Sequence, residues 1–147
     1  MDGEEPARLL RLAEESAAWA YAPYSGFRVG AALWGESGAI HTGCNVENAA
    51  YGIALCAERA ALAAAVRAGE RRFRGLAVWG RRAGTAASPC PPCGACRQAL
   101  AEFCGPEFPV WSAGATGEPV HWTLGALLPE AFALPPPQTD RPGGDVR

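Results

Sequence analysis

The stretch SPCPPCGACRQ, residues 88–98, carries three cysteines at even spacing, Cys90, Cys93 and Cys96. The two prolines between Cys90 and Cys93 favour a polyproline II backbone, in which residues three apart are separated by ~9 Å. Beyond Cys93, the sequence GACRQALAEF has the pattern of a helix that starts after prolines. We therefore predict that Cys93 and Cys96 meet at the start of a helix, whereas Cys90 stays apart.

The segments around this stretch alternate between strand and helix patterns. Residues 27–35 and 40–46 flank a GESG turn, which predicts a β-hairpin. Residues 56–68 are rich in alanine without a helix breaker, which predicts a helix. The other elements that we expect are a helix over 5–20, strands over 75–80, 109–113 and 118–124, a helix over 94–103 and a helical turn over 125–132. This order predicts a three-layer α/β/α fold with a mixed five-stranded sheet.

The length of the chain sets its domain organisation. Its 147 residues are the size of one domain with a core of its own. We assign residues 1–133 to this domain. Residues 134–147, LPPPQTDRPGGDVR, are rich in proline and glycine and are predicted to form a disordered tail.

Charge and hydrophobicity argue against several classes of partner. A net charge of −2 with scattered arginines is unlike the basic stripe of a protein that binds nucleic acid. No segment approaches the ~18 apolar residues that a membrane span needs, and the acidic start of the chain is unlike a signal peptide. We therefore expect a cytoplasmic protein, whose six cysteines are free thiols or metal ligands rather than disulfides.

Two cysteines do not complete a metal site, so a third ligand is needed. Cys56 is favoured because LCAERAAL places it at the start of the alanine-rich helix, as Cys93 stands at the start of its own. Two helix N-termini, which stabilise thiolates, would then converge on one metal. Zinc bound by three thiolates keeps a fourth position for water, the pattern of a catalytic site. The candidates that we set aside are His41, His121, Cys44 and Cys104.

Two charged residues follow Cys56 closely. In mid-helix, positions two apart point to opposite sides, so Glu58 reaches the metal site only if Cys56 lies at or before the first helical residue. A glutamate in this place is otherwise most often a solvated residue that the helix dipole stabilises. Arg59 is expected to offset the negative charge of three thiolates on Zn²⁺, or else to be a surface charge.

A polar pair stands in GCNVENAAY, residues 43–51. On a strand, Asn45 and Glu47 are two apart and face the same side. A carboxylate beside an amide suits the recognition of two neighbouring hydroxyl groups. The alternative is that both are exposed positions of the hairpin.

The motifs around these residues resemble a known family. CAE at 56–58 and PCGAC at 92–96 form the zinc signature of nucleoside and base deaminases. The stretches YAPYSGFRVGAAL (21–33), TGCNVENAAYG (42–52) and LLPEAF (127–132) extend the likeness, which is to the small homotetrameric cytidine deaminases. One departure is that Pro91 stands where the family usually has serine.

The resemblance implies a function and a set of site residues. It implies that cytidine and deoxycytidine are deaminated hydrolytically in pyrimidine salvage, with one zinc per chain held by Cys56, Cys93 and Cys96. Glu58 is the implied proton shuttle. The implied substrate contacts are Phe27, Asn45, Glu47 and Ala57, joined by Ala49, Tyr51 and Phe132, which reach the site of a neighbouring subunit in a homotetramer with shared active sites.

Other functions remain open at this point. One is a deaminase that acts on another small molecule bearing cytosine. Editing of polynucleotides is disfavoured because no basic groove rich in aromatic residues is apparent. The last is a binding module without activity, in which Cys90 or Cys44 closes the zinc site as a fourth ligand.

Overall fold

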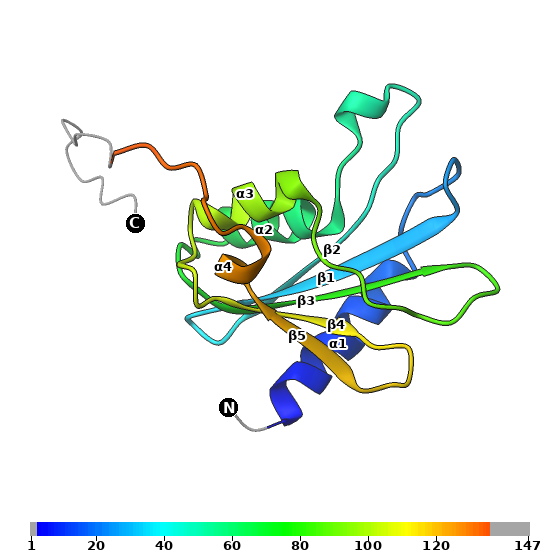
Figure 1. Cartoon of the computed structure of the whole chain (residues 1–147). Helices are drawn as coiled ribbons and strands as arrows, with labels where there is room; N and C mark the ends of the chain where they lie inside the picture. The colour runs from blue at the N-terminus through cyan, green and yellow to red at the C-terminus, as the bar shows by residue number, and fades with distance from the viewer. Residues whose placement is uncertain (1–2, 136–147) are drawn as a thin grey trace.

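A mixed five-stranded sheet runs through the middle of the molecule (Figure 1). The computed structural model describes residues 3–135. The strands follow the order β2-β1-β3-β4-β5, and every neighbouring pair is antiparallel except β3 and β4. Their bounds are β1 Phe27–Gly35, β2 Ile40–Cys44, β3 Phe73–Arg82, β4 Pro109–Ala113 and β5 Pro119–Thr123.

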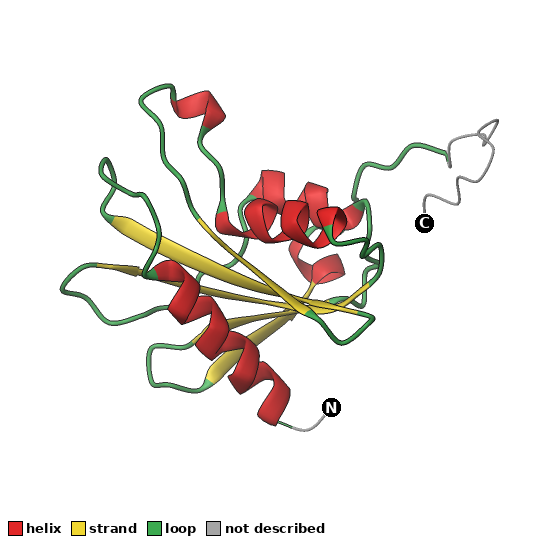
Figure 2. Cartoon of the chain, turned by 180° about the vertical axis from the view of Figure 1, so that it is seen from behind, coloured by secondary structure: helices red, strands yellow, loops and turns green. Residues whose placement is uncertain are grey.

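Helices cover both faces of this sheet, which confirms the predicted three-layer α/β/α fold (Figure 2). Helix α1 (Glu4–Ala17) lies alone on one face. The opposite face carries α2 (Ala57–Arg67), α3 (Gly94–Ala101) and α4 (Leu124–Leu127). A short 3-10 helix, η1 (Tyr51–Ile53), precedes α2. None of the helices within residues 3–135 has the length and apolar character that crossing a membrane requires.

The central strands are apolar on both sides because both layers of helices pack on them. On β1, Ala31 and Leu33 belong to the core beneath α2, whereas Ala32 belongs to the core beneath α1. Two glycines set how closely the helices approach. A Cβ on Gly30 would clash with α1 backbone atoms, and a Cβ on Gly43 would clash with α2 backbone atoms. The second contact places the start of α2 against the edge strand β2.

Some predicted elements are longer than those observed. Helix α1 ends at Ala17 rather than at residue 20, because the chain turns so that Tyr21 forms a bridge with Val46. Strand β2 ends at Cys44, because the Asn45 side chain accepts the hydrogen bond of the β1 backbone. Helix α3 ends at Ala101 and α4 at Leu127, so both are also shorter than predicted. The predicted tail lies outside the described residues except for residues 134 and 135.

Candidate metal centre and its pocket

Two helices start at cysteines and point these cysteines at one place. Cys56 is the N-cap of α2 and Cys93 is the N-cap of α3, both with extended backbone and neither capping its own helix through its side chain. Cys96 lies in the first turn of α3. The Sγ atoms of Cys56 and Cys93 are 3.7 Å apart, and those of Cys93 and Cys96 are 3.6 Å apart. The convergence predicted from the sequence is therefore observed.

The three sulfur atoms fit one zinc ion. All three lie within 4.8 Å of one another. Tetrahedral Zn–S bonds of ~2.3 Å place two sulfur atoms ~3.8 Å apart, close to the separations found here. Burial raises the pKa of Cys56 and Cys96 above that of an ordinary thiol, and a cation bound at this position would stabilise their thiolate forms. Within the described chain, Cys90 and Cys44 are not part of this group of ligands.

Glu58 lies directly beside the sulfur cluster. Because Cys56 is the N-cap and Ala57 the first residue of α2, the geometric condition for Glu58 to reach the site is met. The Glu58 side chain is buried, and its Oε2 atom accepts a hydrogen bond from the Cys96 thiol at 3.5 Å. Burial raises the pKa of Glu58 above that of an ordinary carboxyl. A carboxyl group that binds a proton readily therefore stands beside the metal position.

Arg59 contacts the sulfur cluster at Cys56. Its Nη2 atom lies 3.8 Å from the Cys56 sulfur and donates to the Ala54 carbonyl at 3.3 Å. The contact with Cys56 raises the pKa of Arg59, so the guanidinium stays charged beside the sulfur atoms. Its buried Nε atom has no hydrogen-bond partner among residues 3–135.

A pocket of about 240 Å³ opens onto this cluster. Among the predicted site residues it brings together Cys56, Cys93, Glu58, Ala57, Asn45 and Glu47. Its remaining wall consists of residues that the sequence prediction did not include, namely Val29, Ala54, Leu55, Cys90 and Pro91. Cys90 is thus outside the metal group but part of the pocket, where burial raises its pKa to about 11 and keeps it a neutral thiol.

Asn45 and Glu47 line this pocket from beyond the end of β2. The Asn45 amide accepts from the Val29 N–H at 2.8 Å and donates to the Phe27 carbonyl at 2.9 Å. Glu47 accepts hydrogen bonds from the Ser25 hydroxyl at 2.6 Å and from the backbone N–H groups of Tyr24 and Ser25. These bonds lower the pKa of Glu47, that of the Ser25 hydroxyl having the largest effect. The turn before β1 therefore holds both side chains in place.

Four predicted substrate contacts lie outside the wall of this pocket: Phe27, Ala49, Tyr51 and Phe132. Phe27 packs beside Gly80 and Cys90, since a Cβ on Gly80 would meet both side chains at 2.9 Å. Tyr51 is 79% exposed and Phe132 is 70% exposed. One chain alone therefore does not place these exposed rings in the pocket.

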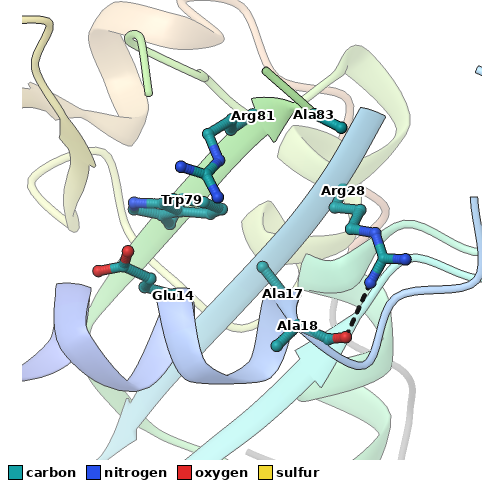
Figure 3. A pocket seen from close by; sticks show the side chains of 7 residues that line it. All are labelled: Glu14, Ala17, Ala18, Arg28, Trp79, Arg81 and Ala83. Atoms are coloured by element: carbon teal, nitrogen blue, oxygen red, sulfur yellow. Dashed lines mark hydrogen bonds between the residues drawn. The ribbon is translucent and has the colours of Figure 1, made fainter. Parts of the chain in front are cut away.

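A larger pocket of about 440 Å³ lies on the α1 face of the sheet (Figure 3). Arg81 stands over the Trp79 ring at 5.3 Å, and Arg28 donates to the Ala18 carbonyl at 2.8 Å. Glu14 lines the same pocket. In the described part of the chain, this pocket contains no cluster of metal-binding side chains.

Comparisons with known proteins agree with this geometry. Residues 4–111 match a family described as the cytidine and deoxycytidylate deaminase zinc-binding region. A cytidine deaminase from Sporosarcina psychrophila is 45% identical over 126 residues, which cover 86% of this chain and 90% of that protein. One from Mycobacterium tuberculosis is 44% identical over 123 residues, covering 83% and 85%. The crystal structure of cytidine deaminase from Burkholderia pseudomallei superposes with a TM-score of 0.77 at 44% identity, covering 86% and 98%.

Proposed function

This chain belongs to the cytidine and deoxycytidylate deaminase family, and on that premise we propose that it converts cytidine and deoxycytidine to uridine and deoxyuridine with release of ammonia. The observation that carries this proposal is the buried Glu58 carboxyl group 3.5 Å from a sulfur atom of the zinc ligands. A metal site that served only structure would not need a buried carboxyl group beside an open pocket.

The chemistry divides between the metal and Glu58. Zinc held by the three cysteines would supply a bound water of lowered pKa, since zinc enzymes lower the pKa of water from ~15.7 toward ~7. Glu58 takes up a proton from the attacking water at a carboxylate oxygen and passes it to N3 of the ring, and it then takes the second proton from the hydroxyl newly formed on C4 and gives it to the amine that leaves. The C4–O bond forms, the C4–N bond breaks, and the products are the uracil nucleoside and ammonia. Burial of Glu58 supports this role, since it keeps bulk water from competing for the proton.

The nucleoside is recognised by the polar residues of the pocket. We assign the sugar hydroxyls to Glu47 and Asn45, and the base to the surface formed by Phe27 and Ala57. Glu47 is suited to this role because Ser25 holds its carboxylate in one orientation before the substrate binds. The second N–H of the Asn45 amide is available, since the first donates to the Phe27 carbonyl.

Arg59 tunes the metal centre. A guanidinium 3.8 Å from the Cys56 sulfur withdraws negative charge from the thiolate and so restores the power of the metal to activate water. The residue is not part of the pocket wall and acts through the ligand alone.

A neighbouring subunit completes the pocket in a homotetramer. Exposed apolar side chains gather around the loop of η1, where Tyr51 forms an edge contact with Tyr24 at 6.3 Å and Ile53 is also exposed. Exposed apolar side chains grouped in this way are typical of a surface that contacts another protein. We assign Ala49, Tyr51 and Phe132 to the site of the neighbouring subunit.

The wider setting follows from the same site. Residues 1–133 act as one deaminase domain, of which the matched family region covers 4–111. Three thiolate ligands suit the reducing cytoplasm, where a deaminase for free nucleosides serves pyrimidine salvage.

The test is a direct assay of the purified protein. Cytidine and deoxycytidine are each mixed with protein of measured zinc content, and the ultraviolet change to the uracil nucleoside is followed. We expect turnover with one zinc per chain. A protein that holds one zinc per chain yet converts neither nucleoside would instead be a zinc-stabilised binding module, and cytosine-bearing compounds without ribose would test the remaining alternative.

A further inference from the structure

The two residues after the zinc ligand Cys96 both bind the C-terminal part of the domain. Arg97 donates from Nε to the Pro92 carbonyl and from Nη1 to the Leu127 carbonyl, each at 2.7 Å. Gln98 donates from Nε2 to the Phe132 carbonyl at 2.9 Å. We name Arg97 and Gln98 the α3 clamp, since both stand on the helix that begins at the zinc site.

Arg97 ties the zinc-ligand loop to the end of α4. Pro92 is fully buried and directly precedes Cys93. A hydrogen bond to the Pro92 carbonyl therefore holds the backbone at the peptide bond that joins it to this zinc ligand. Leu127 is the last residue of α4, where carbonyl groups lack helical partners and favour a cation. The planar guanidinium presents several donors in fixed directions, which allows one side chain to hold both carbonyls.

Gln98 holds the segment that carries Phe132. Residues 129–135 form no helix or strand, so no ladder of backbone hydrogen bonds fixes them. The hydrogen bond from Gln98 ties this segment to α3. The Phe132 side chain itself stays 70% exposed, so the clamp holds its backbone and leaves the ring free to contact another surface.

We propose that the α3 clamp is a pair of positioning residues that set Phe132 relative to the zinc-ligand helix. The proposal rests on the proposed function, in which Phe132 closes the substrate pocket of a neighbouring subunit. Because the clamp and the zinc ligand Cys96 lie on α3, which the ligand Cys93 precedes as N-cap, the position of the metal centre in one subunit is passed to the pocket of the next. Gln98 then affects substrate binding without touching the substrate, and Arg97 affects both metal and substrate.

The first experiment compares Gln98→Ala, Phe132→Ala and the double variant with wild type. Loss of one hydrogen bond predicts a roughly two- to twelvefold increase in KM for cytidine, by the usual ~0.5–1.5 kcal/mol per bond, with kcat and zinc content unchanged. The double variant should have the KM of Phe132→Ala alone, because Gln98 acts only through Phe132. An unchanged KM in Gln98→Ala, or effects that multiply in the double variant, contradicts the proposal.

Fluorine NMR supplies a measurement that does not need catalysis. Protein labelled with 4-fluorophenylalanine, with the Phe132 resonance identified from Phe132→Ala, should show a shifted Phe132 resonance in Gln98→Ala. The same resonance should shift when zinc is removed from wild type. If it moves in neither case, the clamp does not position Phe132, whatever the enzyme acts on. Conversely, a protein without deaminase activity whose resonance does move refutes the proposed function and not the clamp.

Arg97 is tested by two variants. Arg97→Ala should weaken zinc binding about 10- to 100-fold, the range for groups that orient metal ligands, and should also raise KM. Arg97→Lys keeps the charge but cannot hold two carbonyls with a rigid fork, so we expect only partial recovery. Full recovery with lysine, or no change with alanine, contradicts the bridging role.

Discussion

The two faces of the sheet carry pockets of different size and different chemistry. The α1 face has pockets of about 440 and 450 Å³, against about 240 Å³ for the pocket beside the sulfur cluster. The N-cap of α1 is Gly3, followed by two glutamates in the first turn, whereas the N-caps of α2 and α3 are cysteines whose sulfur atoms lie close together. Convergent donor atoms, and not volume, therefore distinguish the reactive face.

The charged groups of the two faces also differ in how they are satisfied. On the α1 face, Arg28 is bound to the end of its neighbouring helix and Arg81 to the Trp79 ring. On the opposite face, Glu58 is buried beside sulfur atoms that need a cation of their own. The arginines of the α1 face therefore already have partners, whereas the sulfur atoms beside Glu58 are held in place to bind a cation.

Removing a metal ligand should have the largest effect. Cys93→Ser is expected to lose bound zinc and all measurable activity, because serine is a poor ligand for zinc at neutral pH. The matched variant is Cys90→Ser, which alters a pocket thiol outside the metal group and should keep both zinc and activity. Zinc content by mass spectrometry of metals and the cytidine assay measure the two effects. Loss of zinc in Cys90→Ser would place that thiol in the metal centre.

The next effect compares one glutamate from each face. Glu58→Gln should lower kcat by about 10²- to 10⁴-fold while zinc is retained, because a proton carrier is lost. Glu14→Gln changes a glutamate that lines the α1 pocket and should leave kcat and KM unchanged. Steady-state rates with cytidine decide between them. Equal losses in the two variants would mean that the faces do not differ as described.

Arg59→Ala should have an intermediate effect. Loss of the contact between its guanidinium and the Cys56 sulfur is expected to lower kcat about 10- to 100-fold with zinc still bound. The comparison is Arg81→Ala on the α1 face, which removes a contact with Trp79 and should not alter kcat. A wild-type kcat in Arg59→Ala would mean that Arg59 is a surface charge without effect on the metal centre.

Two glycines allow the packing of the faces to be compared directly. Gly30→Ala would place a methyl group against α1, and Gly43→Ala would place one against α2. Each should cost about 1–3 kcal/mol of folding free energy from overpacking, or about 2–4 °C in Tm for each kcal/mol. Only Gly43→Ala should also lower kcat, since it displaces the helix that carries Glu58. Calorimetry measures the change in stability, and steady-state rates of the folded variants measure kcat. An equal loss of kcat in Gly30→Ala would contradict the prediction.

The smallest effect concerns the acid side of the pH dependence. The Ser25 hydroxyl lowers the pKa of Glu47 most, so the carboxylate that binds substrate persists to lower pH in wild type. Ser25→Ala should raise the pKa of Glu47, so KM begins to rise at a higher pH as the solution is acidified, with little change at pH 7. Ser37→Ala, which removes a hydroxyl bound to Glu70 instead, is the control. Overlapping curves of KM against pH for Ser25→Ala and wild type contradict the role.

The metal ligands can be predicted because their signals are local. Prolines, a glycine and an alanine-rich run mark the two helix starts, so the sequence pattern favours Cys93 and Cys96 and then Cys56, and the family resemblance implies the same three ligands. Glu58 depends on a helix boundary exact to one residue. That boundary is set in part by the packing of α2 on Gly43, a contact that the sequence alone does not reveal.

The rest of the pocket has no local signal. Val29, Ala54 and Leu55 are ordinary apolar residues that only the tertiary fold brings to the pocket. The even spacing of Cys90, Cys93 and Cys96 bears only on whether Cys90 binds metal. It does not indicate that Cys90 lines the pocket. Asn45 and Glu47 both line the pocket, but β2 ends before them, so the strand that was predicted to place them is not observed, and the Asn45 amide is partly used to hold β1.

The sulfur cluster also has a consequence for how the chain unfolds. Along the chain, Cys56 precedes β3 and Cys93 follows it, and β3 is the central strand of the sheet. Zinc bound by both cysteines would therefore close a loop of the chain that contains this strand. Such a closure restricts the unfolded chain as a disulfide does, which for a separation of 37 residues corresponds to ~4 kcal/mol. The ion therefore acts as a removable cross-link, and the metal content of a preparation sets its resistance to heat as well as its activity.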